Sequence, residues 1–209
     1  DGSPAVGSKI QVCAALCRRA DVSEDGTWSL TGVEEAVYII LSFSQGDTSI
    51  ATTVSLIEIT EDKEIGSMTL HPYATQEAYV SGMHDYVLDG GLTLSLDSDE
   101  LSAGVYSLGS SDTVSSIKIN PAEVPNDVDS SEILAMWMLG DFDHHVEGGI
   151  AWRIDSDLGL EEGTSLTFKY LDNEGHEWAE VGTFTITDGV IDGGDTMLPL
   201  LSTIMVVQN

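Results

Sequence analysis

Residues 163–189 read GTSLTFKYLDNEGHEWAEVGTFTITDG, and this stretch decides the fold class. Apolar and polar side chains alternate on both sides of a polar break at residues 172–175. Successive side chains of a β-strand point to opposite faces, so a period of two predicts half-buried strands joined by a turn. The side chains expected on the buried face are Leu166, Phe168, Tyr170, Trp178, Gly182, Phe184 and Ile186. The stretch therefore predicts a β-hairpin.

Much of the remaining chain follows the same pattern. Residues 37–43 (VYIILSF) are β-branched and aromatic, which favours a buried strand. Residues 92–108 predict a second hairpin, with its turn at residues 97–100. Residues 196–207 (TMLPLLSTIMVV) are strongly apolar and predict a last strand that fills the core or, alternatively, one lent to a neighbouring subunit. We predict an all-β protein: a two-sheet β-sandwich of jelly-roll or Greek-key type, with or without a second smaller β domain.

The best candidate for a boundary between two portions of the chain is residues 121–131 (PAEVPNDVDSS). This segment contains two prolines and several acids, and its apolar residues show no strand or helix periodicity. We predict that this segment is a linker between domains or a long crossover within one sandwich. Residues 9–120 are then a β-sandwich portion, and residues 132–209 a second β portion that completes the sandwich or forms a small second domain. Residues 1–8 (DGSPAVGS) are small and turn-rich, which predicts a flexible or partner-bound arm.

The charge of the chain is far from balanced. Seven Lys and Arg stand against 36 Asp and Glu, a formal net charge of -29. These carboxylates repel one another and oppose folding at low ionic strength, whereas salt at 1 M limits the repulsion to a range of about 3 Å. We therefore expect a protein adapted to high salt, from a halophile or a virus that infects one. The alternative is an acidic extracellular protein from an ordinary marine or soil source.

The strong negative charge also limits the classes of partner that the protein can bind. Phosphate binding requires a basic patch, which this sequence lacks, so we expect neither nucleic acid nor anionic lipid headgroups as partners. No run of eighteen apolar residues occurs, so we expect no membrane-spanning helix.

The two cysteines, Cys13 and Cys17, lie in the segment CAALC. Within one strand they would share a face but lie roughly 13 Å apart, too far for a disulfide. On a helix they would stack at positions i and i+4 and could come close enough. We interpret them as two small buried apolar residues, because free cysteine is among the most buried residue types.

The densest polar cluster is the segment DFDHHVE at residues 141–147. On a strand, Asp141, Asp143, His145 and Glu147 would share one face, and three carboxylates with an imidazole could hold a divalent cation. The alternative is a solvated loop, because acids are abundant throughout this chain. Three acidic, glycine-bearing turns, at residues 21–26, 155–163 and 188–195, are further candidates for weakly bound calcium, although they lack the spacing of a twelve-residue calcium loop. We expect no required cofactor.

The sequence lacks the nucleophile pattern G-x-S-x-G, the zinc pattern H-E-x-x-H, the redox pattern C-x-x-C and the phosphate loop G-x-x-x-x-G-K. Carboxylate pairs for glycoside hydrolysis cannot be picked out among 36 acids. We therefore expect a protein that is not an enzyme.

Three functions follow from these observations. The leading hypothesis is a structural or assembly protein adapted to high salt, such as a capsid, decoration or spike subunit of a virion, which binds copies of itself and other assembly subunits. The second is an extracellular module that binds glycans or cells through loops at one end of the sandwich. The third is a secreted β-sandwich hydrolase with a carboxylate pair. The expected location is a virion, the cell surface or the extracellular medium, at high salt.

Overall fold

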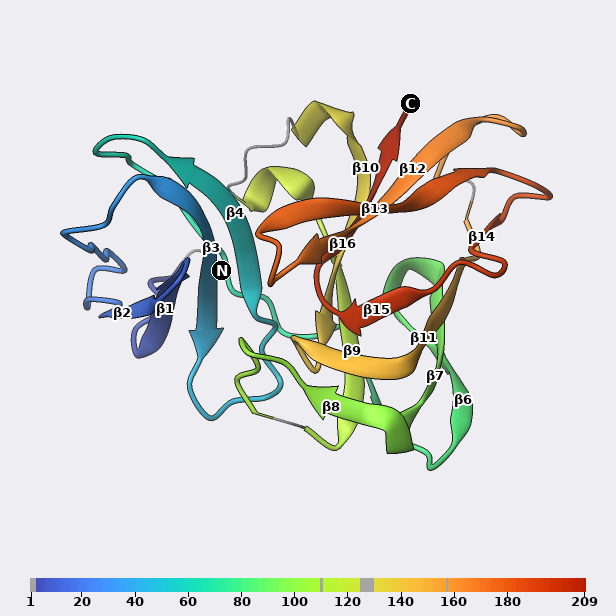
Figure 1. Ribbon diagram of the computed structural model, residues 1–209, viewed down its shortest axis with the longest axis horizontal. Helices are drawn as coiled ribbons and strands as arrows, with labels where there is room; N and C mark the ends of the chain where they lie inside the picture. The colour runs from blue at the N-terminus through green and yellow to red at the C-terminus, as the bar shows by residue number, and fades with distance from the viewer. Residues whose placement is uncertain (1–2, 110, 125–129, 157) are drawn as a thin grey trace.

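The computed structural model describes residues 3–109, 111–124, 130–156 and 158–209, and its regular structure is almost entirely antiparallel β-strand (Figure 1). The strands form three sheets, which we call the N-terminal, central and outer sheets. The central and outer sheets face each other across the main core. The prediction of an all-β, sandwich-like protein is confirmed.

The central sheet has six strands in the order β13-β12-β16-β10-β9-β5. They are β5 (Thr75–Ala78), β9 (Thr113–Ile119), β10 (Ile133–Gly140), β12 (Ser165–Asp172), β13 (Glu177–Thr185) and β16 (Ile204–Gln208). The outer sheet runs β14-β11-β7-β6, and its strand β11 also pairs with β8 and β15. Its strands are β6 (Met83–Val87), β7 (Leu92–Asp97), β8 (Leu101–Ala103), β11 (His144–Ile154), β14 (Ile191–Asp192) and β15 (Leu198–Leu201).

The main core is made by side chains from the facing sides of these two sheets. Leu92, Leu94 and Leu96 of β7 alternate inward and are fully buried. Across the core, the ring of Trp152 stacks on Phe168, with the centroids 3.8 Å apart. Burial of large apolar side chains contributes about 1.5–3 kcal/mol each, so this layer is the main source of stability.

The N-terminal sheet has four strands in the order β2-β1-β3-β4. They are β1 (Ser8–Cys13), β2 (Cys17–Asp21), β3 (Ala36–Ser44) and β4 (Thr53–Ile59). One face packs on turns of the rest of the molecule through Tyr106, Phe142 and Leu171. The opposite face is covered by the long connections at residues 22–35 and 60–70 instead of a second sheet. The smaller sheet thus lies before residue 60, whereas the sequence placed a candidate second portion after residue 131.

Among the residues that the structure describes, the helical segments are four 3-10 turns: η1 (Asp89–Gly91), η2 (Ser98–Glu100), η3 (Pro121–Glu123) and η4 (Ser130–Glu132). Within the described ranges, no helix has the length and apolar character needed to cross a membrane.

The hairpin predicted from residues 163–189 is confirmed as β12 and β13, which pair along their length. The predicted faces are wrong in one place. Phe168 pairs with Gly182 but Lys169 pairs with Glu180, so Val181 is an extra residue in β13. A β-bulge of this kind reverses the alternation, because one inserted residue moves every later side chain to the other face. Trp178 consequently pairs with Leu171 on the opposite side from Phe184.

The hairpin predicted over residues 92–108 is wrong. Strand β7 pairs with β6 and β11, and β8 pairs with β11 instead of folding back on β7. The 3-10 turn η2 separates β7 from β8. Alternation shows which side chains are buried but not which strand lies alongside, and η2 here redirects the chain to a different stretch of β11.

The interpretation of the cysteines as two small buried apolar residues is wrong for Cys17, which is exposed, whereas Cys13 is buried. Cys13 ends β1 and Cys17 begins β2, so the two residues face each other across a tight hairpin with 4.0 Å between their Cα atoms. Their sulfur atoms are bonded. The strand and helix geometries considered for CAALC both missed a chain reversal within the segment.

Residues 121–131 connect β9 and β10, which are neighbours in the central sheet. Residues 125–129 of this segment lie outside the described residues, as do residues 1–2 of the predicted arm. The apolar run 196–207 supplies buried strands to both large sheets: β15 to the outer sheet and β16 to the centre of the central sheet. Its prediction as a core-filling segment is confirmed.

Candidate functional site

The candidate site is the turn that joins β10 to β11 at residues 141–143. It carries Asp141 and Asp143, two of the four residues proposed as metal ligands. The other two, His145 and Glu147, follow in β11. The expectation that all four share one strand face is wrong, because the chain reverses here and Asp143 adopts a positive φ of 59°. The turn also lies next to the N-terminal sheet, since Phe142 packs in the cluster between that sheet and the turns.

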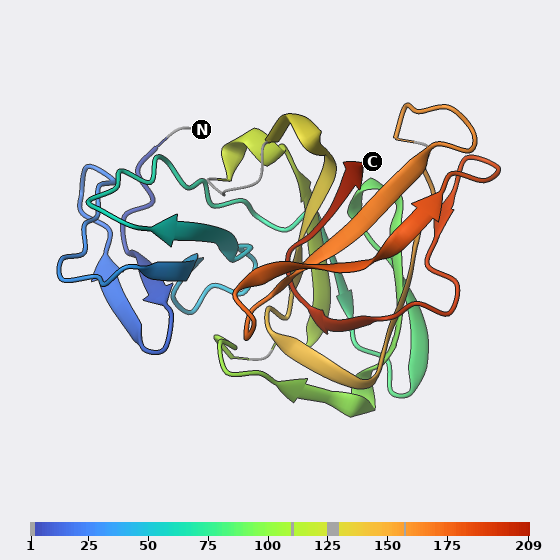
Figure 2. The same cartoon turned by 45° about the horizontal axis from the view of Figure 1, so that its top comes forward.

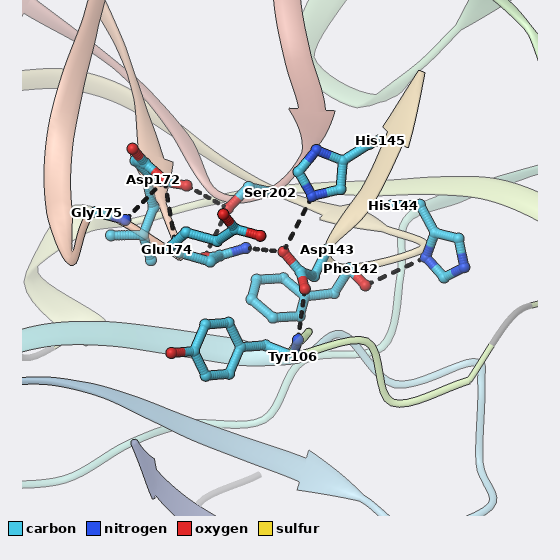
Figure 3. Close-up of polar contacts among 11 residues, drawn as sticks. Tyr106, Phe142, Asp143, His144, His145, Asp172, Glu174, Gly175 and Ser202 are labelled. Atoms are coloured by element: carbon cyan, nitrogen blue, oxygen red, sulfur yellow. Dashed lines mark hydrogen bonds and ion pairs between the residues drawn. The ribbon is translucent and has the colours of Figure 1, made fainter. Parts of the chain in front are cut away.

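Asp143 is fully buried, and both its carboxylate oxygens accept hydrogen bonds (Figure 3). The backbone amide of Tyr106 donates to Oδ2 at 2.6 Å, and Nδ2 of Asn173 donates to Oδ1 at 2.7 Å. Nε2 of His145 lies 4.0 Å from Oδ1. A buried carboxylate requires such partners, because leaving it unpaired in a low-dielectric interior is unfavourable.

The main chain of Asp143 adds two more links. Its amide donates to the carbonyl oxygen of Leu201 at 2.8 Å, and its carbonyl oxygen accepts from the amide of Gly104 at 2.7 Å. A Cβ atom at residue 104 would collide with the Asp143 carboxylate, so this position requires glycine. One aspartate thereby holds together four segments that are distant in the sequence, and we call this group the Asp143 network.

The network extends to the turn between β15 and β16. The hydroxyl of Ser202 donates to the carbonyl oxygen of Leu171 at 3.0 Å and lies 3.4 Å from Oδ1 of Asn173. Asn173 and Ser202 are both buried. Sequence reasoning read Asn173 only as a turn residue and did not single out Tyr106 or Ser202, since no local pattern links three connections so far apart.

Asp141 belongs to a different network. Its Oδ1 accepts from the amide of Ser111 at 2.8 Å, and its Oδ2 accepts from the hydroxyl of Tyr79 at 3.4 Å. Burial raises the pKa of Asp141, opposed by the hydrogen bonds from Ser111 and the charge of His144. Burial and the neighbouring Asp141 carboxyl also raise the pKa of Tyr79.

A small pocket of about 180 Å³ adjoins Asp141. It lies between the loop that follows β3 and the start of the turn, and Tyr73 and Ser111 line it with Asp141. Burial raises the pKa of Tyr73. Asp143 does not line this pocket. The second acid among its lining residues is Asp47, whose Oδ1 accepts from the amide and the hydroxyl of Ser49.

The four proposed metal ligands do not converge. Asp141 and Asp143 serve separate networks, His145 approaches only Asp143, and Glu147 is exposed. Across the ranges that the structure describes, no three His, Cys, Asp or Glu side chains are grouped as a metal site would need. A weakly bound cation in this region stays a prediction.

The acidic turns use their carboxylates locally. Oδ1 of Asp25 accepts from the amide and the hydroxyl of Thr27, and these hydrogen bonds lower its pKa. Oδ1 of Asp192 accepts from the amide of Gly194 at 2.7 Å. Such side-chain contacts to the backbone two residues ahead stabilise turns without any ligand.

No protein-family model, curated protein or solved structure matches this chain.

Proposed function

We propose that this protein is a structural subunit that associates with copies of itself in concentrated salt, and that strand β6 of the outer sheet forms the contact. The observation that supports the proposal is an edge strand with exposed apolar side chains in a chain of net charge -29.

Strand β6 is an edge of the outer sheet. In the part of the chain that the structure describes, it pairs with β7 alone, so one side of its backbone has no strand neighbour. Figure 1 and Figure 2 both place β6 at the end of the molecule remote from the N-terminal sheet. Unpaired strand edges readily add a further strand, and proteins that stay monomeric usually block them with Lys, Pro or bulges. The sequence of β6, MHDYV, contains no Lys or Pro.

The side chains of this edge are unusually apolar for the surface of this protein. Nine large apolar side chains are exposed among the described residues, and three of them lie on β6 or just before it: Val80 at 46%, Met83 at 68% and Val87 at 64%. Burying this surface against a second copy would remove apolar area from water, which favours association.

The face around this edge also carries little charge. Met83, Asp85 and Val87 share their face with the β7 residues to which they pair, namely Asp97, Ser95 and Thr93. The β11 neighbours on that face are Ala151 and Arg153. Oδ1 of Asp85 accepts from the Ser95 hydroxyl, and Asp97 accepts from the amide of Asp99. Asp85 and Asp97 together with Arg153 give this face a formal net charge of only one negative charge, so the repulsion between two such faces is smaller than the total of -29 suggests.

A two-fold symmetric contact explains why salt is needed. If two β6 strands pair antiparallel about Asp85, Met83 lies opposite Val87 of the partner subunit, and Asp85 lies opposite its own copy. The like charges oppose association at low ionic strength and are screened in concentrated salt. Subunits of this kind fit the coat of a virion or a cell-surface layer in brine, which is where we place this protein.

The test is the molar mass of the protein by light scattering in about 3 M KCl, where screening is nearly complete. We expect a dimer or larger species for the wild type and a monomer for Val87→Glu, because the variant places a carboxylate in the contact. Leu16→Glu is the matched control: Leu16 is 82% exposed in the distant β1–β2 turn, so its substitution should leave the mass unchanged. A wild type that stays monomeric at high concentration contradicts the proposal.

A further inference from the structure

We propose a second feature, independent of the β6 contact: the space between the N-terminal sheet and the two connections that cover it, residues 22–35 and 60–70, is a binding site for a small organic cation with an apolar body. The site is a pocket of about 1170 Å³, far larger than the one beside Asp141. Small-molecule sites commonly span about 300–1000 Å³, so the pocket can hold a ligand of ordinary size.

The floor of the pocket is apolar and rigid. Ile10 and Val12 of β1 line it, together with Ser42 of β3. All three are almost fully buried and lie on strands in the middle of the sheet. A floor formed by paired strands holds its shape, which lowers the entropic cost of binding a ligand.

The walls come from the two irregular connections that cover this face. Trp28, Leu30 and Val33 belong to the first connection, and Ile65 and Met68 to the second. All five are only partly buried although they pack against the apolar cluster of the sheet. Part of their apolar surface is therefore still available to a ligand, and the ring of Trp28 can also attract a cation.

The charged side chains that line the pocket favour one charge type of apolar ligand over the others. Five carboxylate side chains line the pocket: Asp25, Glu35, Glu61, Asp62 and Glu64. The only basic side chain among the lining residues is Lys63, whose ammonium group donates to the carbonyl oxygen of Glu58 at 2.8 Å. An anion would meet these carboxylates and the net charge of the whole molecule, whereas an ammonium group can contact them directly. Partly exposed apolar walls beside acidic side chains thus select an apolar cation, of the alkylammonium or arylammonium class.

The test uses three probes with the same six-carbon chain: hexyltrimethylammonium, the neutral hexanol and the anionic hexyl sulfate. Binding is measured by calorimetry, and as a rise in the thermal midpoint, at the lowest KCl concentration that keeps the protein folded. We expect saturable binding of the cation, weaker binding of the alcohol, and no binding of the sulfate. Absence of saturable cation binding up to about 10 mM, or equal binding of the sulfate, overturns the proposal.

Two triple variants, one at the pocket and one remote from it, test where the cation binds. Replacing Glu61, Asp62 and Glu64 together by their amides should weaken cation binding about tenfold and leave hexanol unchanged, because exposed ion contacts are individually weak but add up. The control removes three charges from the β12–β13 hairpin, as Glu174→Gln, Glu177→Gln and Glu180→Gln, and should change cation affinity less than about twofold. Equal effects of the two triple variants contradict the assignment.

Trp28→Ala should weaken the binding of both the cation and the alcohol, since it removes part of the apolar wall. Circular dichroism and the thermal midpoint without ligand confirm that the variant is folded. Unchanged affinity for both probes in a folded Trp28→Ala protein would place binding elsewhere and overturn the proposal.

Discussion

Two aspartates separated by one residue have different roles in this protein. Asp143 is enclosed by donors from distant connections, whereas Asp141 lies beside a small pocket and accepts from Ser111 and Tyr79. The sequence singled out both residues, as parts of one cation site. It could not show their separation, because the identity of their partners depends on which loops meet in space.

The Asp143 network is expected to be the most sensitive polar site for stability. Asp143→Ala leaves the Tyr106 amide and the Asn173 side chain without their acceptor, and an unsatisfied buried donor costs about 1–3 kcal/mol. We predict a loss of roughly 3 kcal/mol in the free energy of unfolding, measured by thermal denaturation in concentrated KCl. The exposed Glu147→Ala should change stability by less than about 0.5 kcal/mol, and an equally small effect of Asp143→Ala would contradict a structural role.

For Asp141 we predict the opposite effect: its replacement should increase the stability of the protein at neutral pH. Burial raises its pKa in the folded state above the usual 3.8, so the folded state is penalised as the pH rises above that value. Asparagine resembles the protonated acid. Asp141→Asn should therefore be more stable than the wild type at neutral pH, and the difference should vanish as the pH falls below 3.8.

The measurement is the thermal midpoint of both proteins across this pH range at constant KCl. Glu147→Gln removes one charge from an exposed position and serves as the control for the general relief of repulsion. A variant that is less stable than the wild type at neutral pH would show that the ionised Asp141 carboxylate stabilises the fold.

At the level of single elements, alternation located strands well but did not reveal where they bulge or reverse. The hairpin of β12 and β13 was predicted from its period of two, yet Val181 breaks that period and moves Trp178 to the other face. An extra residue in a strand leaves no distinct composition, since Val is as suitable for a regular strand as for a bulge. The short reversal between β1 and β2 was missed because its turn, residues 14–16 (AAL), lacks Gly, Pro, Asn and Asp.

The disulfide fixes that reversal. It closes a loop of only five residues, for which the chain-entropy model gives a stabilisation of about 2 kcal/mol. We predict that the double variant Cys13→Ala, Cys17→Ser lowers the thermal midpoint, and that a reducing agent lowers the wild-type midpoint to the same value. The reducing agent should have no effect on the double variant. A wild type insensitive to reduction, with a double variant of equal stability, would contradict this role.

For the molecule as a whole, the alternation of apolar and polar side chains predicted an all-β chain, and the structure agrees. The arrangement of the sheets was beyond the sequence, because strand periodicity carries no information on sheet neighbours. β11 shows this most clearly, since β7, β8, β14 and β15 all pair with it although they come from separate parts of the chain. The cover of the N-terminal sheet, by the rest of the molecule on one face and by long connections on the other, likewise became visible only in three dimensions.

The net charge of -29 makes a prediction for the whole molecule. Few of the 36 acids can pair with seven basic residues, so most of the repulsion has to be screened by dissolved ions. The thermal midpoint should therefore rise steadily between about 0.1 and 3 M KCl. A midpoint independent of salt would mean that the carboxylates are accommodated locally, and the proposal of adaptation to brine would be wrong.

The central claim is that copies of this protein associate through the free edge of β6. Hydrogen exchange at about 3 M KCl tests it most directly, because a backbone amide that pairs with a neighbouring strand exchanges slowly. The amides of Met83, Asp85 and Val87 point away from β7, because the hydrogen-bonded pairs with β7 have the parity of Leu88 and Leu92. We predict that these three amides gain protection in concentrated, associated protein relative to dilute protein, while those of the β1–β2 turn do not change. Association without protection at β6, or no association at any concentration, would contradict the claim.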